Sequence, residues 1–206
     1  MNPHVLKRPS WEHLPVSVDL ETMGLDFDAP VFAIGAVRFT EDGSPLPKGC
    51  PGEFYRLISL KGQAPVEIST LYWWLDQSAE ARAELKLSEK APNVCAVLSE
   101  FTAWLTGHQS TWGTFEGAVW VRGDRDGAWL ENMYKRIAGR EIPYRYNKVQ
   151  NQRTLLDFAE RHMNMDVWVE RTTPMHHALH DARYQAECLQ QVFKRYPNLD
   201  HVLEQE

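Results

Sequence analysis

Two carboxylates stand two residues apart at the end of an apolar segment, in the triplet Asp19-Leu20-Glu21. The alternation of Val16, Val18 and Leu20 predicts a β-strand, in which side chains two residues apart share a face. Two carboxylates this close repel each other unless a cation lies between them. The triplet therefore indicates a site for a hard cation such as Mg²⁺, although a solvated acidic pair has the same spacing.

A histidine-rich segment, HHALHD over residues 176–181, comes directly before the predicted last helix. Asp181 at a helix start either caps the helix or ligates a cation, and a histidine one turn earlier is placed to take a proton from water. His176 and His177 both compete for that role. The step from His176 to His180 also fits zinc, but no acidic or cysteine partner stands at a typical zinc spacing.

A third acidic segment, GDRDG over residues 123–127, follows a short apolar run at 118–121. If that run is a buried strand, the loop brings at least one carboxylate to the carboxyl edge of the sheet. Asp124 and Asp126 are the two candidates. Taken alone, the segment is more typical of a polar turn than of a metal site.

The elements that must position these groups alternate between strands and helices. Apolar patterns predict three leading strands, of which the first two are antiparallel, at residues 15–21, 31–39 and 53–60. Two further short strands are predicted at 118–121 and within 142–150. Helical spacing is found at 65–85, as one or two helices, at 91–105 ending at Gly107, at 126–137 ending at Gly139, at 152–163 and at 181–196. This order predicts an α/β fold with a mixed β-sheet flanked by helices.

Composition narrows the class of protein. The chain has 206 residues, a formal charge of −6 and 43% hydrophobic residues, which predicts one folded domain over 1–206 and excludes a polybasic nucleic-acid binder. The three cysteines form no CxxC pair, so we expect a reducing, cytoplasmic compartment and no disulfide framework. No segment approaches the roughly 20 apolar residues of a membrane span. P-loop, GxSxG and HExxH motifs are absent from the sequence.

Together the acidic motifs resemble the DEDDh exonucleases, the RNase T-like superfamily of 3′-5′ nucleases with an RNase H-like fold. The resemblance rests on DLET at 19–22, an aspartate at the start of a middle helix, and the H-x4-D-A motif. Three further segments resemble the bacterial and phage branch that contains the mycobacterial RNase T-like exoribonuclease and phage T4 exonuclease A. They are WWLDQSAEA at 73–81, RTL at 153–155 and HHALHDARYQA at 176–186, and the whole match covers about residues 14–195.

The resemblance implies that Asp19, Glu21, Asp126 and Asp181 hold two divalent cations, Mg²⁺ or Mn²⁺, and that His176 is the general base. In the family a phenylalanine precedes the aspartate of the second motif. Here Arg125 replaces it and the motif is one residue short. Aligning the motif on Trp129 and Leu130 favours Asp126, whereas counting forward from Gly123 keeps Asp124 as an alternative.

The substrate implied by the resemblance is the 3′ end of single-stranded RNA or DNA, with RNA favoured, and the products are nucleoside 5′-monophosphates. The residues expected to contact it are Thr22, Met23, Gly24, Leu25, Trp73, Trp74, Arg122, Arg125 and Arg153. Three alternatives stay open: a 3′-5′ exodeoxyribonuclease, a phosphohydrolase acting on small phosphate esters, and a non-catalytic nucleic-acid-binding module with the same fold. Homodimers are common in such relatives, so a homodimer is a further expectation.

Overall fold

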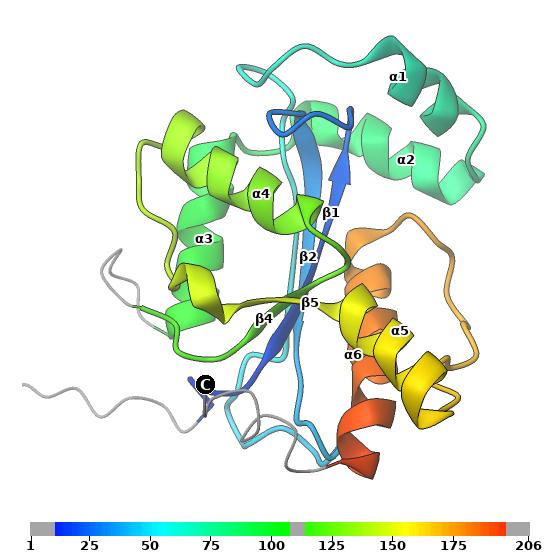
Figure 1. The fold of residues 1–206 in the computed structure, drawn as a ribbon. Coiled ribbons are helices and arrows are strands. Elements are labelled where there is room, and N and C mark those ends of the chain that lie inside the picture. Colours follow the sequence, from blue (N-terminus) through cyan, green and yellow to red (C-terminus); the bar gives the residue numbers. More distant parts are fainter. Residues whose placement is uncertain (1–10, 108–113, 197–206) are drawn as a thin grey trace, which may run out of the picture.

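A five-stranded mixed sheet forms the centre of the computed structural model, which describes residues 11–107 and 114–196 (Figure 1). Its strands are β1 (Val16–Thr22), β2 (Val31–Arg38), β3 (Glu53–Leu57), β4 (Val119–Val121) and β5 (Val149–Asn151), in the spatial order β3-β2-β1-β4-β5. β2 runs antiparallel to β1 and β3, whereas β4 is parallel to both β1 and β5. The predicted mixed sheet and its antiparallel first pair are confirmed.

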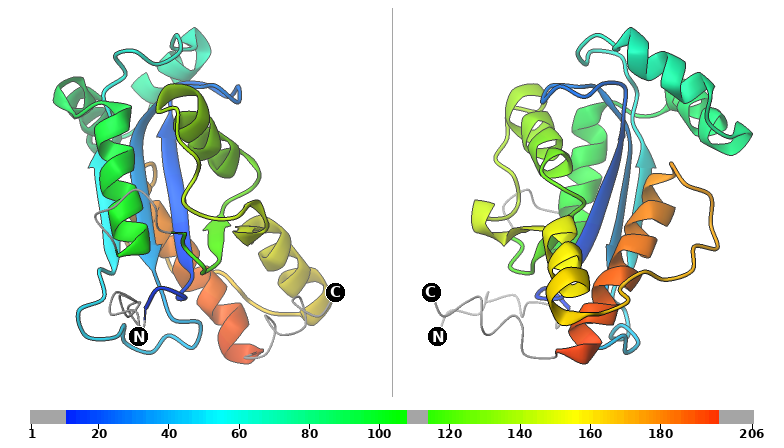
Figure 2. Two further views of the ribbon diagram at one scale, coloured as in Figure 1. Left: turned by 90° about the vertical axis from the view of Figure 1, so that its left-hand side faces the viewer. Right: turned by 45° about the vertical axis from the view of Figure 1, so that its right-hand side comes forward.

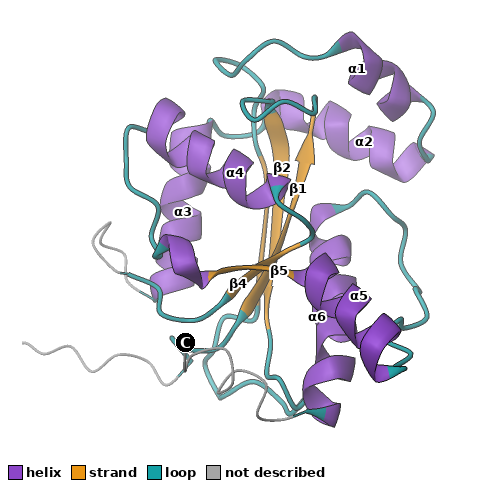
Figure 3. Ribbon diagram, viewed as in Figure 1, coloured by secondary structure: helices purple, strands orange, loops and turns teal. Residues whose placement is uncertain are grey.

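Helices cover both faces of this sheet, and two more stand beyond its edge (Figures 2 and 3). On one face lie α3 (Val94–Thr106) and α4 (Arg125–Asn132), the latter extended by a π-helical turn (Met133–Ile137). On the other lie α5 (Gln152–Met163) and α6 (Ala178–Arg195), while α1 (Ile68–Leu75) and α2 (Ala79–Leu87) form the outlying pair. Two 3₁₀ turns, Ser88–Lys90 and Tyr146–Lys148, complete the described elements.

Local sequence explains where several helices begin and end. Ser78 caps α2 by accepting a hydrogen bond from the Ala81 N–H, and Asn93 caps α3 in the same way. Gly107 ends α3 in a left-handed conformation with φ of 70°, as its position in the sequence predicts. The predicted two-helix option for residues 65–85 is therefore the correct one.

Several predicted boundaries differ from the structure by a few residues, and for two of them the physical cause is clear. β3 ends at Leu57 and not at residue 60, because Ser59 leaves the sheet and donates its N–H to the Pro92 carbonyl. The last helix begins at Ala178 and not at residue 181, because His176 turns the chain with a φ of 64° before it. Asp181 consequently lies in the first turn of α6 rather than capping it.

The two faces of β1 contact different parts of the protein. Val16, Val18 and Leu20 point into the main apolar core with α3 and α4. On the opposite face Ser17 and Asp19 both contact Gln185 of α6: Ser17 Oγ donates to Gln185 Oε1 at 3.3 Å, and Gln185 Nε2 donates to Asp19 Oδ1 at 2.6 Å. The period of two along the strand thus delivers the acidic residues to the α6 side of the sheet. Within the described part of the chain no helix has the length and apolar character needed to cross a membrane.

Candidate active site

Four carboxylates converge at one edge of the sheet. Asp19 and Glu21 come from β1 and Asp181 from α6, and one carboxylate oxygen of each lies within 4.8 Å of the other two. Asp126, in the first turn of α4, accepts a hydrogen bond from the Leu20 N–H through Oδ1 at 3.2 Å. The structure therefore gathers all four carboxylates that the sequence singled out.

Topology explains why they meet. β1 and β4 are parallel neighbours, so their carboxyl ends lie at the same edge of the sheet. From β1 the chain proceeds to β2 on one side, and from β4 to β5 on the other, which makes this edge a topological switch point, a common location for ligand sites in such sheets. The β1–β2 register also shifts between Glu21 and Thr22, an irregularity of the kind that re-aims side chains beside functional sites.

The electrostatics of this cluster are unfavourable without a cation. Burial raises the pKa of Asp19 well above its ordinary value, and the neighbouring charges of Glu21, Asp126 and Asp181 raise it further. The pKa of Glu21 is raised by burial and then by Asp181 and Asp126. Burial raises the pKa of Asp126 to about 7, against the opposing influence of the Leu20 N–H and two arginines. An all-oxygen donor set under mutual repulsion fits Mg²⁺ or Mn²⁺.

Asp126 and Asp124 occupy different surroundings. Asp126 is 7% exposed and hydrogen-bonded to the strand that carries the other carboxylates. Asp124 is exposed, and its side chain makes no capping hydrogen bond to α4. The structure therefore places Asp126, and not Asp124, at the cluster.

His176 contacts both the clustered carboxylates and the tryptophans of α1, Trp73 and Trp74. Its backbone N–H donates to Asp181 Oδ2 at 3.1 Å, and its ring meets Trp73 edge-on with the ring centroids 4.8 Å apart. Burial lowers the pKa of His176 below its ordinary value, partly offset by the charge of Asp181, so the imidazole is neutral and able to accept a proton at pH 7.

His177 and His180 point elsewhere. Their rings stack on each other with centroids 4.0 Å apart, and the other neighbour of His177 is Tyr55 at 4.6 Å. In the described residues the only cluster of three or more ligands close enough to hold a metal ion is Asp19, Glu21 and Asp181, so the His176–His180 zinc alternative gains no support. Of the two candidate bases, His176 is the one that hydrogen-bonds to the cluster, through its backbone N–H, and the one whose ring lies beside Trp73 of the pocket wall.

A pocket of about 440 Å³ opens beside Glu21. Its lining residues come from the end of β1, the loop after it, α1 and α4. They are Leu20, Glu21, Thr22, Leu25, Ser69, Thr70, Trp73, Trp74 and Trp129. Trp73 is 44% exposed, whereas Trp74 is 1% exposed and donates its indole N–H to the Thr22 carbonyl at 2.8 Å. Trp73 is thus available for stacking, and Trp74 mainly fixes the end of β1.

The loop after β1 is held by a residue that the sequence analysis missed. Glu67, just before α1, accepts hydrogen bonds from the backbone N–H groups of Leu25 and Asp26 through Oε1, at 2.7 and 3.2 Å. Gly24 makes room for it, because a Cβ there would lie 2.5 Å from the same oxygen. Nothing in the local sequence around Glu67 signals a contact with a loop more than forty residues earlier.

Met23 does not reach the pocket beside Glu21. It is 1% exposed and packs in the apolar cluster beneath α1 and α2, with Phe32 and Trp74. The expectation that Met23 contacts substrate is therefore wrong. Leu25 is 62% exposed and lines the pocket, as expected for a residue that meets a ligand.

The three arginines expected to contact phosphate are all exposed around this edge. Arg122 and Arg153 both lower the pKa of Asp126, which places their charges close to the carboxylates. Arg125 lies over the ring of Phe27, with its guanidinium carbon 5.7 Å from the ring centroid. These side chains give an acidic chain a local positive border at the cluster.

Two further contacts to the carboxylates were not predicted. Gln185 binds Asp19, and its position four residues after Asp181 on α6 is a spacing signal that the sequence did contain. Arg171 donates to Asp181 Oδ1 at 2.5 Å from the segment between α5 and α6, where no periodic pattern identifies it.

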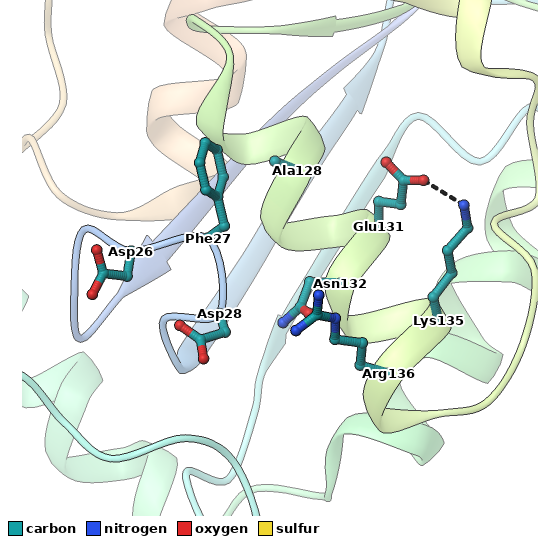
Figure 4. A pocket seen from close by; sticks show the side chains of 8 residues that line it. All are labelled: Asp26, Phe27, Asp28, Ala128, Glu131, Asn132, Lys135 and Arg136. Carbon is teal, nitrogen blue, oxygen red and sulfur yellow. Dashed lines mark hydrogen bonds and ion pairs between the residues drawn. The ribbon is translucent and has the colours of Figure 1, made fainter.

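A larger hollow of about 560 Å³ lies between the β1–β2 loop and α4 (Figure 4). The loop contributes Asp26, Phe27 and Asp28, and the helix with its π-helical turn contributes Ala128, Glu131, Asn132, Lys135 and Arg136. Charges of both signs line it, and Glu131 and Lys135 neutralise each other in an ion pair at 2.6 Å. None of the four clustered carboxylates lines this hollow, so the chemistry belongs to the pocket beside Glu21.

The sheet order, the flanking helices and the acidic edge together define an exonuclease fold of the RNase H-like class. The fold is similar to E. coli exonuclease I in complex with a dT13 oligonucleotide, at 13% identity and a TM-score of 0.62 over 93% of this chain. This chain spans only 43% of the length of exonuclease I. Likewise, the Mg²⁺- and Mn²⁺-bound form of S. pombe Pop2p matches with 14% identity and a TM-score of 0.58, over 90% of this chain and 85% of Pop2p.

The nuclease domain of 3′hExo, a DEDDh family member bound to rAMP, is also similar, at 12% identity and a TM-score of 0.58 over 91% of this chain and 94% of that domain. Among curated proteins, none matches this sequence. Residues 15–193 match the model of the 3′-5′ exoribonuclease Rv2179c-like domain, and the chain therefore belongs to that family of 3′-5′ exonucleases. The predicted RNase H-like exonuclease fold is confirmed.

Proposed function

We propose that this protein is a two-metal 3′-5′ exoribonuclease that shortens single-stranded RNA by one nucleoside 5′-monophosphate at a time. The observation that carries the proposal is the convergence of Asp19, Glu21 and Asp181, with ligand oxygens within 4.8 Å, beside an aromatic pocket. Asp126 adjoins them through its hydrogen bond to Leu20. A module that only binds nucleic acid has no need of such repulsion.

The four carboxylates would hold the divalent ions, Mg²⁺ or Mn²⁺. When bound, such ions supply Lewis-acid stabilisation of the phosphate and lower the cost of deprotonating water. S. pombe Pop2p, which has the same fold, is known in a Mg²⁺- and Mn²⁺-bound form. The oxygen-only donor set and the raised pKa values of Asp19 and Glu21 support the same assignment here.

His176 takes the proton of the attacking water. Its lowered pKa keeps the imidazole neutral at pH 7, and its backbone bond to Asp181 ties it to the carboxylates. As the water oxygen bonds to phosphorus, the bond from phosphorus to the 3′-oxygen of the preceding nucleotide breaks. The leaving 3′-oxygen takes a proton from solvent, so that the shortened strand ends in a new 3′-hydroxyl. The released nucleotide keeps its 5′-phosphate, and His176 returns its proton to solvent.

The pocket explains action at a strand end. Trp73 and Leu25 offer exposed apolar surface for the terminal base, while Thr22, Ser69 and Thr70 offer hydroxyl groups to its sugar. A base inside a duplex is stacked on both sides and cannot occupy such a pocket without unpairing. Arg122, Arg125 and Arg153 are positioned to contact the phosphates of the remaining strand.

RNA is the favoured substrate because the matched family is described as an exoribonuclease and 3′hExo was solved with rAMP. Exonuclease I, in contrast, was solved with a DNA oligonucleotide. The segments WWLDQSAEA and HHALHDARYQA support the assignment to the bacterial and phage branch. A cytoplasmic location and a homodimer stay predictions from the sequence.

Sugar preference is tested by competition between matched strands. Single-stranded RNA and DNA of one sequence, carrying different 5′ fluorophores, are digested together in Mg²⁺, and the wild type should consume the RNA faster. A second pair of RNA strands, one of which ends in a DNA nucleotide, shows whether the 2′-hydroxyl of the last sugar decides. Faster loss of the DNA strand would make the protein an exodeoxyribonuclease. A separate reaction contains a mononucleotide ester, and hydrolysis of that ester without shortening of either strand would make the protein a small-molecule phosphohydrolase.

A further inference from the structure

Arg171 contacts the clustered carboxylates from the segment between α5 and α6. Its Nη1 donates to Asp181 Oδ1 at 2.5 Å, and the two side chains are only 19% and 12% exposed. The same nitrogen contacts the Pro174 carbonyl at 3.5 Å. Over the described ranges 11–107 and 114–196, no other basic side chain forms an ion pair with Asp19, Glu21, Asp126 or Asp181.

One face of the Arg171 guanidinium also packs over the ring of Tyr184. The guanidinium carbon of Arg171 lies 4.3 Å from the ring centroid of Tyr184. Tyr184 is three residues after Asp181 on α6, so the helix presents the carboxylate and the ring on one side. A planar guanidinium that binds a carboxylate and stacks on a ring is held in one place, which a flexible surface arginine is not.

Both oxygens of Asp181 are occupied by donors from this segment. Oδ1 accepts from Arg171, and Oδ2 accepts from the His176 N–H. A divalent ion held by Asp181 would share that carboxylate with a positively charged side chain, and the two positive charges would repel each other. Without an ion, the same guanidinium neutralises one of the four crowded carboxylates.

We infer that Arg171 is an internal counter-ion of the active site, which stabilises the ion-free cluster and competes with the divalent ion for Asp181. This role rests on the proposed function, because it requires Asp181 to be a metal ligand. Arg171 is thereby a positioning residue. It sets the concentration of divalent ion at which the site is occupied, and its contact with the Pro174 carbonyl holds the segment that carries His176.

The test measures Mn²⁺ binding in the absence of nucleic acid, by calorimetry and by the electron paramagnetic resonance signal of free Mn²⁺. The proteins are the wild type, Arg171→Gln, Arg171→Lys and Arg183→Gln. Arg183 is the matched control, since it lies two residues after Asp181 but is paired with Glu53 at 2.6 Å. Arg171→Gln should bind Mn²⁺ about fivefold more tightly, because one repelling charge is gone. Arg171→Lys and Arg183→Gln should stay within about twofold of the wild type.

Thermal unfolding supplies a second readout. In EDTA the midpoint of Arg171→Gln should fall below that of the wild type, and the rise on adding Mn²⁺ should be larger. If Arg171→Gln does not fold, Tyr184→Leu removes the surface that holds the guanidinium and should shift Mn²⁺ affinity in the same direction.

Equal or weaker Mn²⁺ binding by Arg171→Gln overturns the inference. An equal gain in Mn²⁺ affinity in Arg183→Gln also overturns the inference, because the effect would then come from the net charge of the protein and not from the contact with Asp181. A wild type that binds no Mn²⁺ defeats both this inference and the proposed function. A wild type that binds Mn²⁺ but releases no nucleotide defeats the proposed function alone, and the affinities still decide the role of Arg171.

Discussion

Gly35 of β2 and Ala178 of α6 are in direct backbone contact. A Cβ on Gly35 would lie 2.2 Å from the carbonyl carbon of Ala178, closer than any side chain can be accommodated. Gly35 is also the residue of β2 that pairs with Asp19 on β1. The absence of a side chain at this one position therefore lets the start of α6, and with it Asp181, come down onto the strand that carries Asp19 and Glu21.

Replacing Gly35 with alanine should force α6 away from the sheet. We expect the free energy of unfolding to fall by about 2 kcal/mol or more, the cost typical of overpacking against backbone. The affinity for Mn²⁺ should fall as well, because Asp181 moves away from Asp19. Urea unfolding and Mn²⁺ titration measure the two effects.

Gly52→Ala is the control for Gly35→Ala, since its new methyl group would meet only the end of the Leu46 side chain. It should leave both quantities close to the wild type. A Gly35→Ala protein with unchanged Mn²⁺ affinity would show that the approach of α6 does not set the geometry of the cluster.

His176→Asn should lower kcat by about a hundredfold to ten-thousandfold, the usual contribution of a general base, while Mn²⁺ and RNA binding persist. Asparagine is the appropriate substitute because His176 has a φ of 64°, and asparagine tolerates that left-handed conformation better than most residues. His177→Asn is the matched neighbour, and it should keep most of the turnover because its ring stacks on Tyr55 and His180. A larger loss of kcat in His177→Asn than in His176→Asn would show that His177 is the general base.

The ion-free protein should lose stability as pH rises. Burial raises the pKa of Asp126 to about 7, and those of Asp19 and Glu21 are raised as well, so the folded state keeps protons that the unfolded state has released. Stability falls with pH wherever the folded state binds more protons. Histidines with lowered pKa values, such as His176, act in the opposite direction below their ordinary value of 6.5, so the measurement belongs at pH 6.5 to 8.

Thermal midpoints in EDTA should therefore decline across that range, and the gain in midpoint from Mg²⁺ should be greater at pH 8 than at pH 6.5. Asp126→Asn should show a shallower decline. A flat profile in EDTA would mean that the carboxylates are not under the repulsion described here.

Arg38 should matter for stability and not for chemistry. It is 1% exposed and donates to the carbonyls of Trp104, Leu105 and Trp11, each at 3.2 Å, at the end of β2 remote from the acidic cluster. Arg38→Met leaves those carbonyls without their donor and should lower the free energy of unfolding by about 3 kcal/mol.

The matched control for Arg38 is Arg56→Met, which breaks an exposed ion pair with Glu100 and should cost less than about 1 kcal/mol. Activity of folded Arg38→Met at low temperature should equal that of the wild type. A fully stable Arg38→Met would show that the buried guanidinium is dispensable.

Sequence reasoning succeeded where the information was local. The pair Asp19 and Glu21 lies within one strand, and the spacing of His176 and Asp181 spans a single turn into a helix, so periodicity alone indicates which side chains share a face. The mixed sheet followed from alternating strand and helix patterns in the same way. The preference for Asp126 over Asp124 came from aligning the second motif of the resembling family on the helix residues Trp129 and Leu130, and the structure places Asp126 beside the other carboxylates.

Sequence reasoning failed where a contact joins distant segments. Arg171 and Glu67 lie in stretches without a periodic pattern, and their partners are fixed only when the chain folds. Met23 stands two residues after Glu21, but the turn of the chain after β1 directs its side chain into the core. The start of α6 at Ala178, three residues before the predicted start, depends on the backbone conformation of His176, which no periodic pattern encodes.

Digestion of 5′-labelled single-stranded RNA in Mg²⁺ tests the central claim most directly, with wild type and Asp19→Asn compared side by side. The wild type should produce a ladder that shortens one nucleotide at a time from the 3′ end and should stop in EDTA. Asp19→Asn, which keeps the shape of the side chain but removes its charge, should be at least about a hundredfold slower. Internal cuts, early release of the 5′ label, or undiminished digestion by Asp19→Asn would contradict a two-metal 3′-5′ exonuclease centred on these carboxylates.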